Sequence, residues 1–93
     1  MQLLQFAVPQ RLGYACGEAV TRIAGGATLL EAGWGWWVNG SGEVERERVN
    51  WLIVGADEEK ADGVIAVVKE ILKGGGENAI FYVVGGRPQL EDL

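Results

Sequence analysis

The aromatic and basic residues in the middle of the chain are its best candidates for a binding site. Three tryptophans precede an Asn-Gly turn signal and two arginines follow it, namely Trp34, Trp36, Trp37, Arg46 and Arg48. Indole rings beside guanidinium groups can stack a base, a sugar or another flat ligand. The same set can instead form a protein interface, or a cross-strand aromatic cluster that stiffens a hairpin. Both interpretations stay open from the sequence.

Glutamates alternate along the segment after the turn, at Glu43, Glu45 and Glu47. Residues two apart on a strand share a face, so these carboxylates would form a row. Such a row can exchange protons with a substrate or hold a hard cation such as magnesium. It can equally be a solvated strand whose charges discourage aggregation.

Glycine clusters raise the question of a phosphate loop, because the chain has 15 glycines. A phosphate loop presents backbone amides at the N-terminus of a helix that follows a strand. The clearest cluster, Gly74, Gly75 and Gly76, follows a predicted helix instead of preceding one. We therefore interpret the glycines mainly as turns and helix ends, and keep these three as a candidate anion-binding loop.

The amino-acid composition argues against several classes of function. The net charge is −5, which opposes binding to nucleic acid and to anionic membranes. The chain has no histidine and a single cysteine, so it lacks the commonest metal ligands and cannot form an intrachain disulfide. No run approaches the roughly 18 apolar residues of a membrane span, and the start lacks the basic region of a signal peptide. We predict a cytoplasmic protein without metal or cofactor.

Hydrophobic periodicity predicts the elements that position these residues. The predicted strands are 3–8, 27–38, 43–54 and 79–84, and the predicted helices are 10–24 and 58–73. This order predicts an α+β, ferredoxin-like βαββαβ sandwich, a four-stranded antiparallel sheet with two helices on one face. The domain would cover 1–86, with 87–93 a loose acidic tail. Cys16 falls in the apolar stripe of the first helix, where we expect a small core residue.

The Asn-Gly turn also predicts which residues of the hairpin face one another. The expected pairs are Val38–Glu43, Trp36–Glu45, Trp34–Glu47, Trp37–Val44, Gly35–Arg46, Gly33–Arg48, Leu30–Trp51 and Leu29–Leu52. The predicted strands are apolar on both faces, and 48% of the residues are hydrophobic. A second subunit would cover the sheet face without helices. We therefore expect a homo-oligomer, either a dimer or a trimer.

Two resemblances to known families cover most of the chain. The motifs Gly25-Gly26-Ala27-Thr28 and Gly35-x-Trp37, followed by a glycine turn and Glu43 or Glu45, resemble a family of small uncharacterised bacterial and phage proteins. The likeness runs over residues 20–84. It implies a ferredoxin-like fold and no assigned activity.

The second resemblance is to the PII-like superfamily of trimeric signalling proteins, which includes the CutA-type group. VNWLIVGADEEKADGVIAVVKEI is similar to the third strand and second helix of that superfamily, and KGGGENAIFYVV to its glycine-rich approach to the last strand. In nucleotide-binding members this approach and a long middle loop hold ATP or ADP at subunit clefts, which implies a role for Gly74, Gly75 and Gly76. This chain has a four-residue turn in place of the loop and Glu77-Asn78-Ala79 in place of Asp-Gly-Lys.

Three functional hypotheses follow. The first is a non-catalytic homo-oligomeric interaction protein whose hairpin contacts a partner or a neighbouring subunit. The second is a PII-like small-molecule sensor that binds a nucleotide at inter-subunit clefts. The third is a small cofactor-free enzyme with a pocket near Asn50 and Trp51. We expect a binding protein rather than an enzyme.

Overall fold

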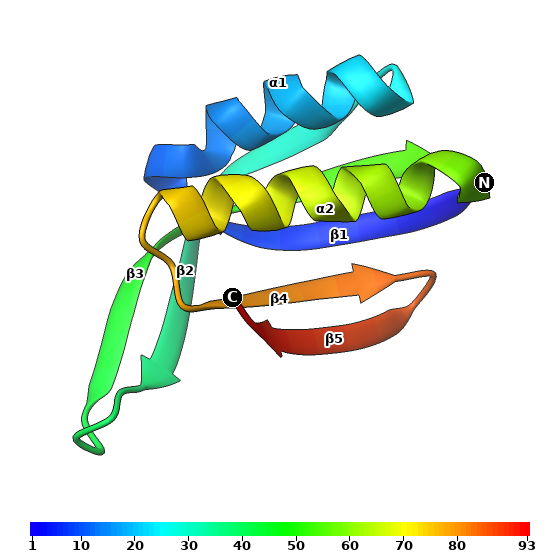
Figure 1. The fold of residues 1–93 in the computed structure, drawn as a ribbon. Coiled ribbons are helices and arrows are strands. Elements are labelled where there is room, and N and C mark those ends of the chain that lie inside the picture. Colours follow the sequence, from blue (N-terminus) through cyan, green and yellow to red (C-terminus); the bar gives the residue numbers. More distant parts are fainter.

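Two helices cover one face of a five-stranded antiparallel sheet (Figure 1). The computed structural model describes residues 1–93 except for the side chain of Ala32. The elements are β1 Gln2–Pro9, the 3₁₀ turn η1 Gln10–Leu12, α1 Gly13–Ala24, β2 Thr28–Val38, β3 Val44–Ala56, α2 Glu58–Gly74, β4 Ala79–Val84 and β5 Arg87–Asp92. The strands lie in the order β2-β3-β1-β4-β5. The predicted α+β class and the order of the first six elements are confirmed.

The core lies between the helices and every second residue of the central strands. Leu4, Phe6 and Val8 of β1 are fully buried, and their sequence neighbours point to the other side. The buried positions of α2 recur at helical spacing, at Ala61, Val64, Val68 and Leu72. Cys16 of α1 is completely buried among them, as expected for a core residue, and this burial raises the pKa of its thiol to about 11.

The sheet face away from the helices, here called the open face, is apolar and partly exposed. Leu30, Phe81 and Leu90 are exposed there, and half-buried Trp51 lies between Leu30 and Phe81. The Trp51 indole N–H donates to the Gln5 side-chain oxygen at 2.9 Å, so its polar atom is satisfied within the chain. No helix in the described part of the chain is long and apolar enough to span a membrane.

The hairpin of β2 and β3 departs from the expected register at its tip but not at its base. Leu30 faces Trp51 and Leu29 faces Leu52, as predicted. Between Leu30 and Gly33 the register shifts by one residue, a β-bulge. The observed pairs beyond it are Gly33–Val49, Trp34–Arg48, Gly35–Glu47, Trp36–Arg46, Trp37–Glu45 and Val38–Val44. The six predicted pairs beyond the bulge are wrong because the bulge moves β2 by one position, which changes every facing pair.

The segment 87–93, expected as a loose tail, contributes the fifth strand. Gly85 and Gly86 both have positive φ, 54° and 84°, and make a two-residue hairpin turn from β4 into β5. Pro88 is tolerated because β5 is an edge strand. Glu91 forms an ion pair with Lys69 of α2 and accepts a hydrogen bond from the Tyr82 hydroxyl at 2.8 Å. The acidic residue Glu91, which suggested a solvated tail in the sequence, therefore holds β5 against the rest of the fold.

The Glu91 contacts predict a pH-dependent contribution to stability. Hydrogen bonds from Lys69 and Tyr82 hold the pKa of Glu91 below its ordinary value of 4.5. The stabilisation is therefore present above pH 4.5 and is lost as the pH falls through the lowered pKa. Glu91→Gln should lower Tm at pH 7, and the difference from wild type should close as the pH falls through the lowered pKa of Glu91.

Asp92→Asn is the matched control, because Asp92 is exposed and has no ion pair among the described side chains. Thermal unfolding followed by circular dichroism measures both variants. Equal Tm values for Glu91→Gln and wild type at pH 7 would contradict the role of this ion pair in holding β5.

Candidate functional site

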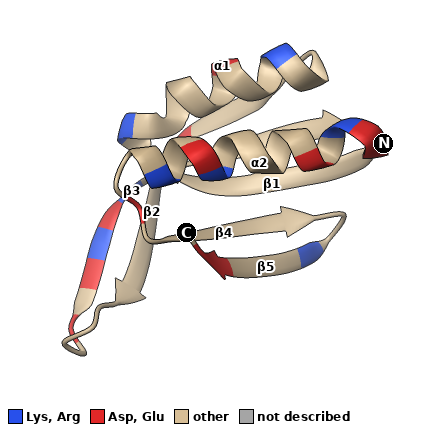
Figure 2. Cartoon of the chain, in the orientation of Figure 1, with Lys and Arg blue, Asp and Glu red and all other residues tan. Residues whose placement is uncertain are grey.

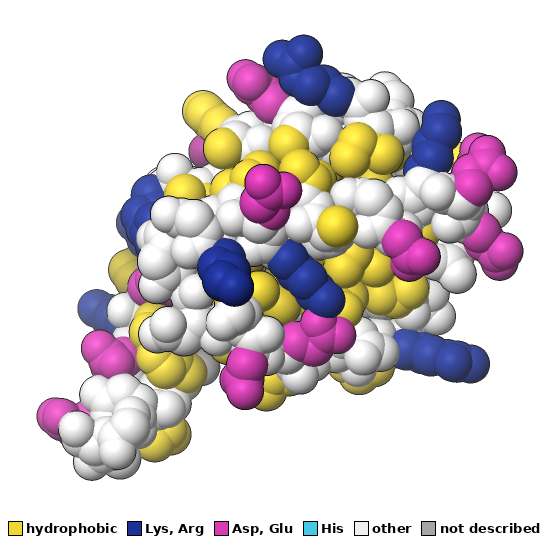
Figure 3. All heavy atoms as spheres, in the orientation of Figure 1, with side chains coloured by type: hydrophobic (Ala, Val, Ile, Leu, Met, Phe, Trp, Pro, Cys, Tyr) yellow, Lys and Arg dark blue, Asp and Glu magenta, His cyan; other side chains and the backbone are white. Residues whose placement is uncertain are grey.

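The hairpin extends beyond the rest of the sheet. The last β1 residue in the sheet, Pro9, pairs with Val49 of β3, so residues 44–48 have no partner on that side. The projection makes the molecule elongated, with extents of 40 × 23 × 22 Å (Figure 1). We call residues 33–49 the hairpin. In the space-filling view it projects at the lower left and carries yellow, magenta and dark-blue side chains (Figure 3).

One face of the hairpin combines aromatic and basic side chains. We call it the arginine face, and it consists of Trp34, Trp36, Arg46 and Arg48. The guanidinium carbons of Arg46 and Arg48 lie 4.8 Å and 4.6 Å from the centroid of the Trp34 ring. Trp36 is 62% exposed. Four of the five predicted binding residues therefore come together, and Trp37 does not join them.

The opposite face carries acidic residues instead. This glutamate face consists of Gly35, Trp37, Glu45 and Glu47, because these residues form the alternate facing pairs. Figure 2 shows acidic and basic residues alternating along β3 in the hairpin. Glu43 precedes β3, and its backbone N–H donates to the Asn39 side chain in the turn at 3.0 Å. The expected row of three glutamates is thus a pair.

A cleft of about 720 Å³ lies between the hairpin, the α2–β4 connection and strands β4 and β5. We call it the hairpin cleft. Its lining includes Trp37, Glu45, Glu47, Gly76, Asn78 and Phe81. The cleft is lined by residues from both candidate sites proposed from the sequence, since Trp37 belongs to the hairpin and Gly76 to the glycine loop. Trp36 of the arginine face also contributes to the lining.

The glycine loop has little capacity left to bind an anion. The N–H groups of Gly75, Gly76 and Glu77 donate to the carbonyls of Ile71, Lys73 and Leu72, at 2.9, 3.1 and 2.9 Å. The loop also follows the C-terminus of α2, where the helix dipole repels negative charge. A Cβ on Gly75 would approach Leu12 to 2.7 Å, so this glycine allows close packing. Gly74, Gly75 and Gly76 end a helix, and only Gly76 lines the cleft.

The hairpin cleft is electrostatically acidic. Burial raises the pKa of the Glu47 carboxyl, Glu77 raises it further, Arg11 opposes the rise, and Glu45 adds to it. Arg11 is engaged in an ion pair with Glu77 at 2.8 Å. An acidic cleft with aromatic walls favours a neutral or cationic ligand with a flat ring over a polyphosphate.

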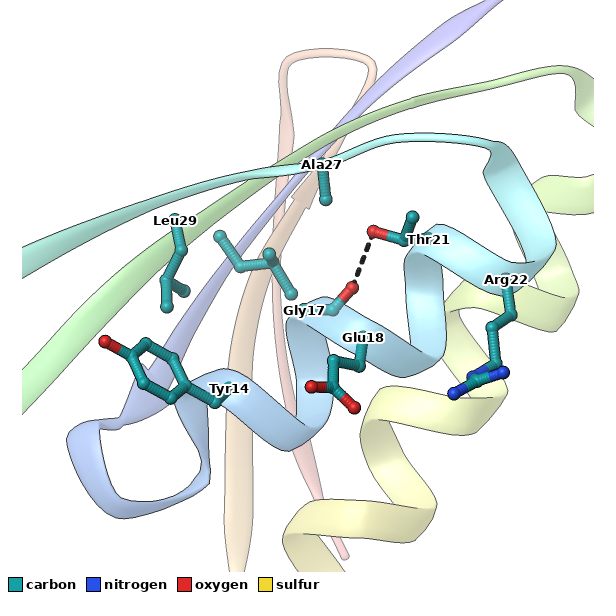
Figure 4. A pocket seen from close by; sticks show the side chains of 8 residues that line it. Tyr14, Gly17, Glu18, Thr21, Arg22, Ala27 and Leu29 are labelled. Carbon is teal, nitrogen blue, oxygen red and sulfur yellow. Dashed lines mark hydrogen bonds between the residues drawn. The ribbon is translucent and has the colours of Figure 1, made fainter.

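A second groove of about 450 Å³ lies between α1 and β2 (Figure 4). Leu29 and Leu52 line its apolar part, and Tyr14, Glu18 and Arg22 of α1 supply aromatic and charged groups. The Thr21 hydroxyl is already used, since it donates to the Gly17 carbonyl at 2.7 Å. This groove was not predicted from the sequence. The available signal was the i, i+4 spacing of Tyr14, Glu18 and Arg22 on one side of the helix.

The pocket proposed near Asn50 and Trp51 does not exist as one site. The two side chains point to opposite faces of β3, Asn50 toward the helices and Trp51 toward the open face. Asn50 is 1% exposed, and neither polar atom of its amide has a partner among the described atoms. Gly13 leaves room for this amide, because a Cβ there would lie 2.3 Å from its nitrogen. In the described residues, no three His, Cys, Asp or Glu side chains gather to hold a metal ion.

The raised pKa of Glu47 predicts a stabilising substitution. A carboxyl with a raised pKa favours the folded state while protonated, and this advantage is lost as the pH rises through the folded-state pKa. In the unassociated single chain, Glu47→Gln should therefore raise Tm at pH 7, and its advantage over the unsubstituted chain should disappear below the ordinary carboxyl pKa of 4.5. Glu43→Gln at the exposed tip is the control. A lower Tm for Glu47→Gln at pH 7 would mean that the charge of Glu47 is stabilised rather than penalised.

Comparisons with known proteins support the fold. No protein-family model matches the sequence, and no curated protein sequence matches it. CutA from the plant-pathogenic bacterium Xylella fastidiosa is similar in structure, with a TM-score of 0.70 and 12% identity over 89% of this chain and 79% of that chain. A phage SAM lyase in complex with S-methyl-5′-thioadenosine has a TM-score of 0.67 and 10% identity, over 99% of this chain and 88% of that chain. The likeness to CutA shows that the two chains share a fold.

Proposed function

We propose that this protein is a homo-oligomer that binds a small nucleoside-type molecule in the hairpin cleft. This proposal joins the first two hypotheses drawn from the sequence, in which the hairpin meets a neighbouring subunit and a ligand occupies a cleft between subunits. A cytoplasmic location remains a prediction from the sequence. So does the resemblance to the small bacterial and phage family.

The observation that carries the proposal is the composition of the hairpin cleft. Its volume of about 720 Å³ lies in the range of roughly 300–1,000 Å³ that is usual for small-molecule sites. Trp37 and Phe81 offer flat apolar surfaces, while Asn78 and the carboxylates of Glu45 and Glu47 offer hydrogen-bonding groups. Aromatic walls with a few polar groups are the usual composition of a nucleoside site.

The charge of the cleft narrows the ligand class. Glu45, Glu47 and Glu77 all line it, and a phosphate group would have to approach these carboxylates. A nucleoside without phosphate, such as a thioether or sulfonium derivative of adenosine, avoids this repulsion. The similarly folded phage lyase is described in complex with S-methyl-5′-thioadenosine, a nucleoside of this class. We therefore depart from ATP and ADP, the ligands that the PII-like resemblance implied.

The oligomer is supported by the open face of the sheet. Leu30, Phe81 and Leu90 are exposed there, and contiguous exposed apolar residues of this size usually mark an interface. A small domain buries a limited share of its surface, so covering this face adds apolar burial that one chain cannot supply. Closed homo-oligomers provide such cover from an identical copy.

Trp37→Ala tests the ligand site. S-methyl-5′-thioadenosine should bind wild type, and removing the indole should weaken binding by about 10-fold or more, since one stacked base contributes about 1–3 kcal/mol. Isothermal titration calorimetry measures the affinity, and tryptophan fluorescence provides a second readout. ATP should bind far more weakly than the nucleoside because of the carboxylates in the cleft.

Tyr14→Ala is the matched control, because it removes an exposed aromatic ring from the groove between α1 and β2. Its affinity for the nucleoside should equal that of wild type. Absence of nucleoside binding to wild type, or equal losses in both variants, would refute the proposed site.

A second candidate function is hydrolysis of a sulfonium nucleoside in the same cleft, in which water attacks the carbon of a C–S bond, the neutral thioether leaves with the bonding electrons and a base takes the proton of the water. The observation that favours it is Glu47, a partly buried carboxyl with a raised pKa. A carboxylate at this position can take the proton of the attacking water. The phage protein that shares this fold is itself a SAM lyase.

This candidate predicts release of S-methyl-5′-thioadenosine when the protein is incubated with S-adenosylmethionine. Glu47→Gln should reduce the rate by about 100-fold or more, the usual contribution of an acid–base group. Liquid chromatography measures the product, and Glu43→Gln at the hairpin tip is the control. Wild-type protein that binds the nucleoside but releases none of it from S-adenosylmethionine would restrict the function to binding.

A further inference from the structure

The two faces of the hairpin carry opposite charges. Arg46 and Arg48 lie on the arginine face, and Glu45 and Glu47 lie on the glutamate face. Because the residues alternate along β3, the separation by sign follows directly from the strand geometry. Each hairpin therefore presents a cationic aromatic surface on one side and an acidic aromatic surface on the other.

The arginine face is organised but unpaired within the chain. Both guanidinium groups lie over the Trp34 ring, at 4.8 Å and 4.6 Å. The ion pairs found among the described residues are Arg11–Glu77 and Lys69–Glu91, so neither arginine of the hairpin meets a carboxylate. Stacking on the ring holds the two cations close together despite their mutual repulsion.

The glutamate face is the surface that these arginines would match. It lines the hairpin cleft together with Glu77, and burial raises the pKa of Glu47. A cation beside these carboxylates would offset the cost of keeping them charged. Within its own chain, the cation that acts on Glu47 is Arg11, which is already paired with Glu77.

We propose that the arginine face of one subunit docks on the glutamate face of a second copy and completes its hairpin cleft. Arg46 and Arg48 of the neighbour then pair with Glu45 and Glu47, and its Trp34 contributes to the ligand site, so a single chain holds an incomplete site. This inference rests on the proposed function for the identity of the site, but the docking itself rests on the two charged faces.

The arrangement also determines the kind of assembly. A two-fold contact of arginine face on arginine face, or glutamate face on glutamate face, would bring like charges together and is disfavoured. Arginine face on glutamate face is a head-to-tail contact, which produces a closed ring when the rotation closes. The five or so residues that extend past Val49 span about 16 Å, enough to reach over the edge of an adjacent subunit.

Charge reversal on each face tests the docking. Arg46→Glu with Arg48→Glu places acid against acid, and Glu45→Arg with Glu47→Arg places base against base. Each double variant should weaken self-association by about 10-fold or more, because like charges at an interface cost several kcal/mol. Native mass spectrometry and analytical ultracentrifugation measure the subunit number over a dilution series.

The quadruple variant that carries all four charge reversals gives the decisive test of the docking. It exchanges the two faces, so every head-to-tail contact again joins opposite charges, and association should recover to near the wild-type level. Arg22→Glu with Lys60→Glu is the matched control, because it reverses two exposed cations on the helices and should leave association unchanged.

Three results would overturn the inference. The first is a wild-type monomer at all concentrations. The second is unchanged association in both double variants. The third is a quadruple variant that shows native circular dichroism but remains dissociated. A variant that loses native circular dichroism is replaced by the milder pair Arg46→Gln with Arg48→Gln, which should still weaken association.

Nucleoside binding separates this inference from the proposed function. If association follows the charges but S-methyl-5′-thioadenosine does not bind, the docking stands and the ligand assignment fails. If the nucleoside binds a dissociated double variant, Arg46→Glu with Arg48→Glu, as tightly as wild type, the cleft is complete in one chain. That result would overturn the contribution of the second copy.

Discussion

The bulge between Leu30 and Gly33 determines what each side of the hairpin presents, since strand side chains alternate between two faces. Without the extra residue, Trp34 and Trp36 would share a face with Glu45 and Glu47, and the arginines would face glycines. With it, Trp34 faces Arg48 and Trp36 faces Arg46. The separation of the Trp and Arg side chains from the carboxylates therefore depends on one β-bulge in an edge strand.

The same hairpin explains why the chain can have a site at all. The space between the helices and the sheet is filled by the side chains of the core, which pack closely. Strands that continue past their neighbours create a concave surface outside the core, at the edge of the sheet. Gly33 and Gly35 contribute by lacking a side chain, because a Cβ at these positions would come within 2.8 Å and 3.2 Å of Val49.

Sequence patterns predicted the elements well because burial imposes a period on each of them. Apolar residues recur at helical spacing in α2, as at Val64 and Val68, and alternate in β1. β5 was missed because Pro88 and the acidic residues suggested a tail, although a Gly-Gly pair after a strand is also a hairpin signal. Glu91 meets its cation on α2, a contact between distant segments that no local pattern reveals.

The candidate site was predictable only in part, for a similar reason. Local spacing identified the tryptophans and arginines, but the bulge that divides them lies at Glu31 and Ala32, where no glycine or proline marks it. The cleft depends on where the hairpin points, which brings Trp37 to the loop at Gly76.

Charge in a small acidic protein has a further consequence for assembly. With a net charge of −5, two copies repel one another at long range, and an interface must supply opposite charges locally. Arg46 and Arg48 are two of only eight basic residues, and they lie together on the part of the chain that extends furthest from its own core. The same electrostatic argument therefore favours a head-to-tail contact that sets Arg46 and Arg48 against the carboxylates of a neighbouring copy.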